Sequence, residues 1–148
     1  MPTRYRLFAL LAETQPDPAA LEARLATLDP AALIVLAADV VDASADVRPK
    51  WEGPYVPERG VCFSEDSTED LTGWIVAQGE PYWRGLVGAG DEALLAAAAE
   101  RDRERADVAG GRWSGRTPHV GGLIFRAYRR SGAGDWFEAL ERELSTRG

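Results

Sequence analysis

Four carboxylates lie within six residues, from Glu65 to Asp70, and large aromatic residues follow them along the chain. Carboxylates beside aromatic rings can hold a cationic group, by Coulomb attraction and by cation–π contact. We therefore predict that Glu65 or Asp66 fixes a cationic group of a ligand, and that Trp74 and Tyr82 form part of the wall of the site.

The same carboxylates stand in or just before the first turn of a predicted helix. At that position the helix macrodipole favours negative charge by roughly 0.3 to 1 kcal/mol for each exposed group. Stabilisation of the helix is therefore an alternative interpretation of the cluster. A metal site is a third, but oxygen-only cation sites need more ligands than this segment supplies, so we expect neither a metal nor a cofactor.

A segment rich in proline and glycine, residues 46–60, carries Trp51 and Tyr55. Its prolines forbid a long helix and indicate an irregular, extended loop. Large aromatic residues on such a loop either pack it onto the body of the protein or line a ligand site. We count Trp51 and Tyr55 among the residues expected to bind the ligand.

The only histidine, His119, lies in a second glycine-rich segment, residues 109–122, together with Trp113 and Arg116. Arginine and histidine on such a loop can contact an anion such as phosphate or carboxylate. His119 can also serve as a general acid or base beneath a mobile lid. A surface loop without a chemical role is the alternative. Trp113 and Arg116 are ligand-binding candidates, and His119 is the catalytic candidate.

The only cysteine, Cys62, lies between Val61 and Phe63, near the acidic cluster. Acidic neighbours raise the pKa of a thiol, so we interpret Cys62 as a small buried hydrophobic residue. A nucleophilic Cys62 would need His119 as its base, and only the fold could bring the two together.

The hydrophobic pattern predicts an all-α single domain, spanning residues 1–148, of six or seven helices with two irregular loops. The expected helical segments are about 4–14, 18–28, 30–43 and 68–78, a short one after Pro81, then 92–108, 123–130, and a last one from Trp136 through Leu144. The third segment is apolar nearly all round, so it belongs in the core together with 68–78. The charged end of segment 92–108 is expected to be solvated.

Capping residues predict where several of the helices start. Thr3 is expected to cap the first helix, and the repeated Asp-Pro-Ala-Ala-Leu at Asp17 and Asp29 predicts two more starts with proline in the first turn. Two capping boxes are expected, Ser67 with Asp70 and Asp135 with Glu138.

Composition sets the broad class of the protein. The net charge of −7 argues against nonspecific nucleic-acid binding, because phosphate repulsion would have to be overcome. No signal-peptide segment and no apolar run of membrane length are present, so we expect a cytoplasmic protein that does not bind a membrane.

The stretch CFSEDSTEDLTGWIVAQGEPYWRGLV, with Cys62, Ser64-Glu65-Asp66, Trp74 and Gln78-Gly79, resembles domain-of-unknown-function family 4240, small bacterial proteins. LDPAALIVLAADV is similar to the long buried helix of that family, and AYRRSGAGDWFEAL to its terminal turn. The loops 48–60 and 113–119 depart from the family pattern. The family has no established activity, so the resemblance implies an α-helical fold and no catalytic residue.

Three functional hypotheses follow. The leading one is a binding protein for a cationic small molecule or peptide, with the aromatic and acidic residues above as its pocket. The second is a protein that masks a basic protein partner, as immunity or regulatory proteins do, because an acidic body suits a basic partner. The third is a small biosynthetic enzyme that uses His119 as acid or base.

Overall fold

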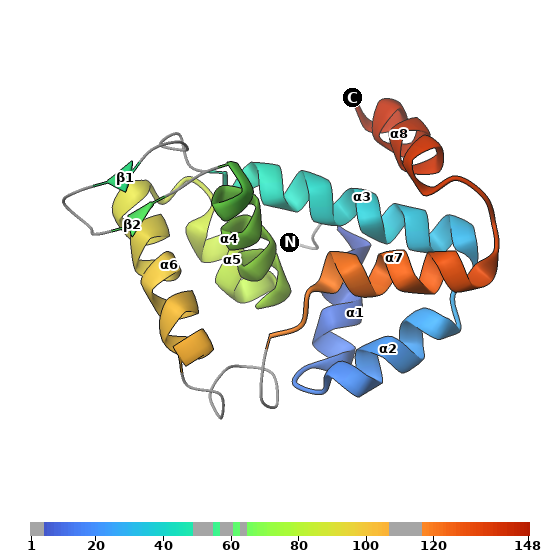
Figure 1. Ribbon diagram of the computed structural model, residues 1–148, viewed down its shortest axis with the longest axis horizontal. Helices are drawn as coiled ribbons and strands as arrows, with labels where there is room; N and C mark the ends of the chain where they lie inside the picture. Colours follow the sequence, from blue (N-terminus) through green and yellow to red (C-terminus); the bar gives the residue numbers. More distant parts are fainter. Residues whose placement is uncertain (1–4, 49–54, 57–60, 63–64, 107–116) are drawn as a thin grey trace.

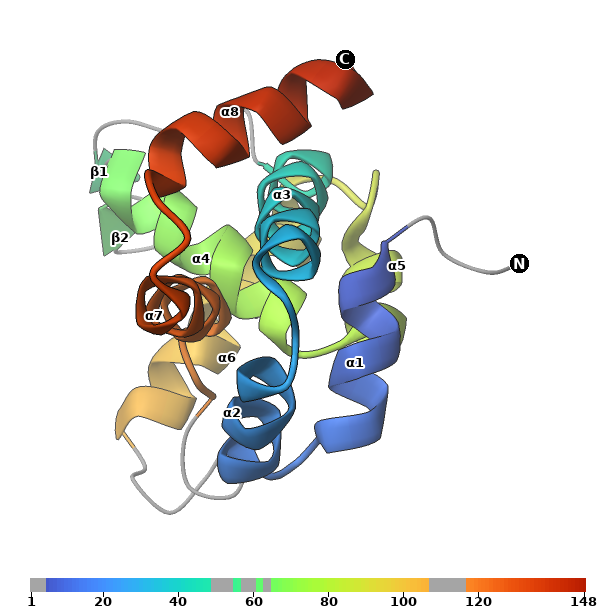
Figure 2. The ribbon, with the colours of Figure 1, turned by 90° about the vertical axis from the view of Figure 1, so that its right-hand side faces the viewer.

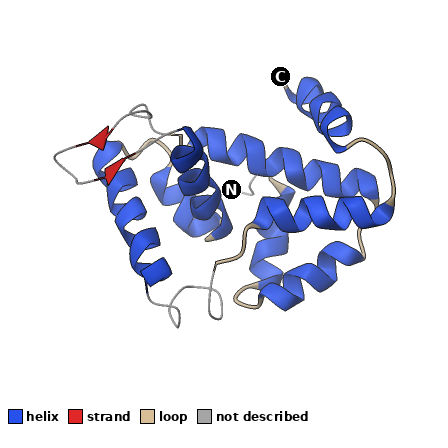
Figure 3. Ribbon diagram, viewed as in Figure 1, coloured by secondary structure: helices blue, strands red, loops and turns tan. Residues whose placement is uncertain are grey.

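The computed structural model describes residues 5–48, 55–56, 61–62, 65–106 and 117–148, with the backbone alone at 55, 56, 61, 62, 65, 67, 105 and 106. Eight helices and one short hairpin make up the secondary structure of these residues (Figures 1 and 3). The helices are α1 (Arg6–Thr14), α2 (Pro18–Ala26), α3 (Pro30–Asp46), α4 (Glu65–Ala77), α5 (Glu80–Leu86), α6 (Asp91–Ala106), α7 (Val120–Ser131) and α8 (Trp136–Arg147). The strands are β1 (Tyr55–Val56) and β2 (Val61–Cys62). The predicted helical class is confirmed, and the described residues contain more helices than the six or seven that we predicted.

Helix α3 is the central element, and it packs against α1, α4, α7 and α8 (Figure 1). Figure 2 looks nearly along α3 and shows α1, α2, α7 and α8 arranged around it. Leu33, Ile34 and Leu36 of this helix are buried, as expected for a helix with apolar residues on most of its faces. The prediction that this segment lies in the core is confirmed.

Helix α4 is the second buried helix. Leu71 and Ile75 have no exposed surface, because α4 is covered by α3, α5, α6 and α7. At the other end of the core, the rings of Tyr5, Phe8 and Trp83 form a cluster with centroids 4.9 to 6.0 Å apart. This cluster joins α1 to α5.

Three of the predicted caps are present. The Asp17 carboxylate accepts the Ala19 N–H at 3.0 Å, and the Asp29 carboxylate accepts the Ala32 N–H at 2.8 Å. At the start of α8, Asp135 accepts the Glu138 N–H at 2.9 Å. Each bond satisfies a backbone donor that the first turn of a helix leaves without a partner.

Helices α1 and α4 do not begin where we predicted. Helix α1 begins at Arg6 with Tyr5 at its N-cap position, and the predicted cap, Thr3, lies outside the described residues. The Leu7 N–H is accepted at 3.0 Å by Asp39 of α3. Helix α4 begins at Glu65, three residues before the predicted start near Thr68, so Ser67 lies inside the helix and not at its N-cap.

The charged end of α6 is also different from the prediction. Arg101 and Glu104 are buried, at 8% and 9% exposure, and not solvated as we expected. They face α4: Arg101 pairs with Asp70 at 3.1 Å, and Glu104 accepts the indole N–H of Trp74. The alternating charges of α6 therefore do not reveal, in the sequence, that one side of this helix bonds to α4.

The predicted irregular loop 46–60 contains one strand of the hairpin. Tyr55 pairs with Cys62 and Val56 with Val61 in antiparallel register. Two-residue strands lie below the length that sequence alternation can reveal, which is why we predicted only a loop here. Among the described residues, no helix combines the length and the apolar character needed to cross a lipid bilayer.

Candidate functional site

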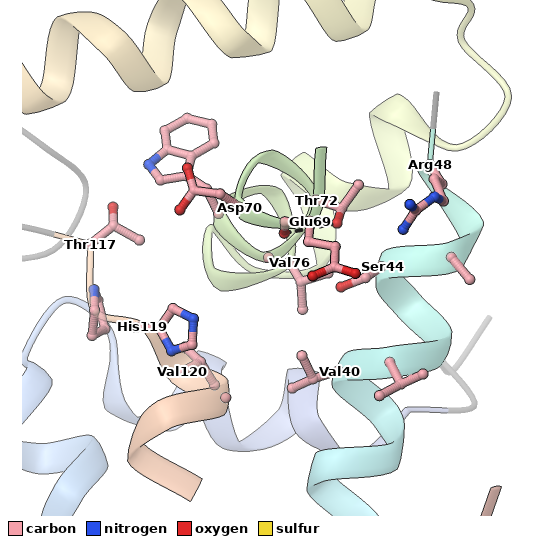
Figure 4. A pocket seen from close by; sticks show the side chains of 16 residues that line it. Val40, Ser44, Arg48, Glu69, Asp70, Thr72, Val76, Thr117, His119 and Val120 are labelled. Carbon is pink, nitrogen blue, oxygen red and sulfur yellow. Dashed lines mark hydrogen bonds between the residues drawn. The ribbon is translucent and has the colours of Figure 1, made fainter. Parts of the chain in front are cut away.

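A cavity of about 480 Å³ lies between α3, α4 and the start of α7 (Figure 4). Val40 and Ser44 line it from α3, and their spacing of four residues places them one above the other on one face of the helix. Arg48, which follows the end of α3, also lines it. The volume is within the usual range of about 300 to 1,000 Å³ for small-molecule sites.

The wall from α4 is made by Glu69, Thr72, Gly73 and Val76. Their spacing of i, i+3, i+4 and i+7 again defines one helical face. A Cβ atom at Gly73 would have nothing within 4 Å, so the missing side chain leaves open space in the middle of this wall.

The two carboxylates on this part of α4 differ in their partners. Asp70 forms an ion pair with the Arg101 guanidinium at 3.1 Å, which ties α4 to α6. Glu69 is exposed, and its carboxylate forms no ion pair with any side chain that the structure describes. Glu69 is therefore the acidic group that can bind a ligand without first breaking a contact within the described part of the protein.

Trp74 is 6% exposed and is fixed from behind by the buried carboxylate of Glu104. Glu104 also accepts the backbone N–H of Thr117 at 3.0 Å and the hydroxyl of Thr117. The amide of Gln78 bridges the Trp74 carbonyl and the Thr117 hydroxyl, at 3.1 Å each. This network holds the segment before α7 against α4 and so places the rim of the cavity.

His119 is exposed, lines the cavity and caps α7. Its Nδ1 accepts the Gly122 N–H at 2.8 Å, which explains why α7 starts at Val120 and not at Leu123 as predicted. Nδ1 can accept only when the imidazole is neutral, and in that form the proton is on Nε2. A Cβ atom at Gly122 would lie 2.7 Å from Nδ1, so the glycine makes room for this cap.

The structure separates the predicted site residues into three groups. Trp74 and His119 both line the cavity. Asp66 is exposed and is not part of the lining, whereas Tyr82 lies behind Trp74, with ring centroids 5.6 Å apart and its hydroxyl bonded to Glu100 at 2.8 Å. The proposed wall of Trp74 with Tyr82 is therefore an edge-to-face pair, of which Trp74 alone lines the cavity.

The remaining candidates are not placed as side chains. Trp51, Trp113 and Arg116 lie outside the described residues, and only the backbone is described at Tyr55 and Glu65. The described parts of the two predicted loops do reach the cavity, because Arg48 of residues 46–60 and Thr117 and His119 of residues 109–122 line it.

Sequence reasoning missed Ser44, Arg48 and Glu69. For Glu69 a signal existed, because Gly73 and Val76 follow it at i+4 and i+7, a face next to the Leu71, Trp74, Ile75 stripe. We took Glu69 only as part of an N-terminal acidic cluster.

A second hollow, of about 780 Å³, lies beside α8 and is lined by Asp39, Asp42, Glu143 and Arg147. One guanidinium already satisfies these carboxylates: Arg147 lies 2.8 Å from Asp39 and 3.1 Å from both Asp42 and Glu143. Because Arg147 already neutralises the carboxylates of this hollow, the cavity beside Glu69 is the better candidate site.

Within the described ranges, no group of three or more His, Cys, Asp or Glu side chains is arranged to hold a metal ion. Comparison of the chain with protein-family models, with curated proteins and with solved structures found no match. The resemblance to domain-of-unknown-function family 4240 therefore stays a prediction.

Proposed function

We propose that this protein binds a small molecule or short peptide that carries a cationic group on an apolar body. One observation carries the proposal: a cavity of about 480 Å³ has a lining with both apolar and polar side chains and includes the carboxylate of Glu69, which has no ion pair among the described side chains. Ligand sites typically combine an apolar surface with a few polar groups that orient the ligand. The acidic residue in this proposal is Glu69 and not Glu65 or Asp66.

Phenethylamine is a suitable probe, because it joins one ammonium group to one apolar ring. We expect calorimetry to detect its binding to the wild-type protein and to show at least a tenfold loss of affinity in Glu69→Gln, which corresponds to about 1.4 kcal/mol. Asp66→Asn is the matched control, since it removes an exposed carboxylate from the same helix outside the cavity. Equal affinities of wild type and Glu69→Gln would contradict the proposal.

A second pair of variants tests the location. Gly73 and Gly85 are both helical, and a Cβ atom at either position would meet nothing within 4 Å. Only Gly73 lines the cavity. We therefore expect Gly73→Leu to abolish phenethylamine binding and Gly85→Leu to preserve it. The same loss in both variants would place the site elsewhere.

His119 at the edge of the cavity supports a second candidate, an enzyme in which Nε2 exchanges a proton with the bound molecule. Asn is among the best N-cap residues, so His119→Asn keeps an acceptor for the helix start and removes the imidazole. Mass spectrometry of bound amines or peptides after incubation tests this candidate. Conversion by the wild type that is lost in His119→Asn supports an enzyme, and an unchanged ligand supports a binding protein.

A further inference from the structure

The cavity has one polar end with both signs of charge. Arg48, Ser44 and Glu69 line this end, and Figure 4 shows the Arg48 and Glu69 side chains directed toward the same region. Arg48 follows the last turn of α3 and Glu69 belongs to α4, so the two charges come from separate parts of the chain. A ligand placed between them meets an anion on one side and a cation on the other.

Away from this polar end, Val40, Val76 and Val120 give the cavity apolar surface, one from each of the three helices that form it, and His119 lies next to Val120 (Figure 4). Val40 lies one turn before Ser44 on the same face of α3, and Arg48 follows the end of this helix, so the wall changes from apolar to charged toward the C-terminal end of α3. The lining therefore fits a molecule that has charges at one end and an apolar chain at the other.

We propose that the ligand is a zwitterion with an apolar side chain, as in a free apolar α-amino acid. This inference rests on the proposed function, because it uses the same cavity and the same role of Glu69. The ammonium group bonds to the Glu69 carboxylate, the carboxylate bonds to the Arg48 guanidinium, and the Ser44 hydroxyl bonds to either group. The side chain lies on Val40, Val76 and Val120.

Each charged contact adds specificity, because a charge-assisted hydrogen bond is lost when either the ligand group or the protein group is removed. An amine without a carboxylate leaves Arg48 without its ligand contact, and a carboxylic acid without an amine leaves Glu69 without its contact. The two losses are separable, which allows ligand changes to be paired with protein changes.

The test is a calorimetric titration of L-phenylalanine, phenethylamine and 3-phenylpropionate against wild type, Glu69→Gln and Arg48→Gln. We expect the wild type to bind L-phenylalanine at least tenfold more tightly than either analogue. Arg48→Gln should remove the advantage of L-phenylalanine over phenethylamine, and Glu69→Gln its advantage over 3-phenylpropionate. Arg103→Gln, an exposed change on α6 outside the cavity lining, is the control and should bind as wild type does.

The possible failures differ. If phenethylamine binds as tightly as L-phenylalanine and Arg48→Gln changes nothing, the zwitterion is overturned and the cation-binding function stands. If none of the three compounds binds, both proposals are overturned. A parallel titration of the dipeptide Phe-Leu distinguishes the source of the zwitterion: tighter binding of L-phenylalanine supports a free amino acid, and tighter binding of Phe-Leu overturns that assignment in favour of a peptide.

Discussion

The Asp39 carboxylate of α3 contacts both the first helix, α1, and the last helix, α8. It is 1% exposed, accepts the Leu7 N–H at the start of α1, and contacts Arg147 of α8 at 2.8 Å. Burial raises the pKa of Asp39 above its ordinary value of 3.8, although the hydrogen bond from Leu7 and the Arg147 guanidinium both act to lower it. The folded protein therefore holds a proton on Asp39 more readily than the unfolded chain does.

This shift has a defined sign for stability. Because the folded state binds the proton more tightly, the contribution of Asp39 to the free energy of unfolding is greatest below pH 3.8 and falls as pH rises from there through the raised pKa. Urea unfolding of wild type and Asp39→Asn across pH 3.5 to 6 measures it. We expect the free energy of unfolding of the wild type to increase relative to that of Asp39→Asn as the pH is lowered. Movement the other way would mean that the Arg147 contact outweighs burial.

Glu104 is the second buried carboxylate with a structural role, since it accepts bonds from Trp74 and from two donors of Thr117. We expect Glu104→Gln to destabilise the protein by about 2 kcal/mol. The glutamine amide has an NH₂ group in place of one carboxylate oxygen, so one of the N–H or O–H donors of Trp74 and Thr117 would lose its acceptor. Chemical unfolding measures the loss, and near-ultraviolet circular dichroism reports on Trp74. Arg103→Gln, on the exposed side of the same helix, should change neither signal.

At the scale of elements, α4 has a glycine in its middle that lowers the stability of the helix and leaves space in the wall of the cavity. Gly73 lies in the middle of this helix, and a glycine there costs up to about 1 kcal/mol relative to alanine. Gly73 does not have a positive φ angle, and a Cβ atom would have no neighbour within 4 Å, so alanine fits the backbone and the space. We expect Gly73→Ala to raise the free energy of unfolding by about 0.5 to 1 kcal/mol in a urea titration. A loss of stability would show that the space is not open.

Helix α8 is attached at both of its ends. Its first residue, Trp136, packs its ring against Phe125 and Tyr128 of α7, with ring centroids 5.1 and 5.4 Å apart. None of its residues is buried, and at its C-terminal turn Arg147 contacts Asp39, Asp42 and Glu143 and donates to the Val35 carbonyl. We expect Arg147→Gln to cost about 2 to 3 kcal/mol, because it leaves the buried Asp39 without its cation. Hydrogen exchange should accelerate in α8 before it does in α4.

The control for α8 is Arg142→Gln. The Arg142 side chain is 71% exposed and pairs with Glu138 one turn away, and such surface pairs contribute about 0.5 kcal/mol or less. Equal effects of Arg142→Gln and Arg147→Gln on exchange in α8 would contradict the special role of Arg147.

How well an element could be predicted depended on where its signals lie. The starts of α2 and α3 were predictable, because Asp17 and Asp29 cap helices with bonds to residues two or three positions ahead. The start of α1 was not, since the carboxylate that accepts its Leu7 N–H is that of Asp39, thirty-two positions away. The buried side of α6 was hidden for the same reason: its contacts with α4 are long-range and its own sequence reads as polar.

At the scale of the whole molecule, the sequence led us to predict a site of acidic and aromatic character, but it could not locate the cavity. Trp74 was predicted because a tryptophan beside carboxylates is visible in the sequence. The choice between Asp66 and Glu69 required the rotation of α4 relative to α3, which packing of whole helices decides. Arg48 required the knowledge that α3 continues to Asp46 and so delivers the next residues to the mouth of the cavity.

Asp39 and Val40 are neighbours in the sequence, yet the first is covered by α8 and the second lines the cavity. Helix α3 thus has the C-terminal helix α8 on one side and the candidate ligand site on the other. The Nε–H of Arg147, bonded to Glu143 at 3.1 Å, gives nuclear magnetic resonance a reporter outside the cavity. Its resonance should follow small displacements of α3 on titration, so occupancy can be read from a residue that does not touch the bound compound.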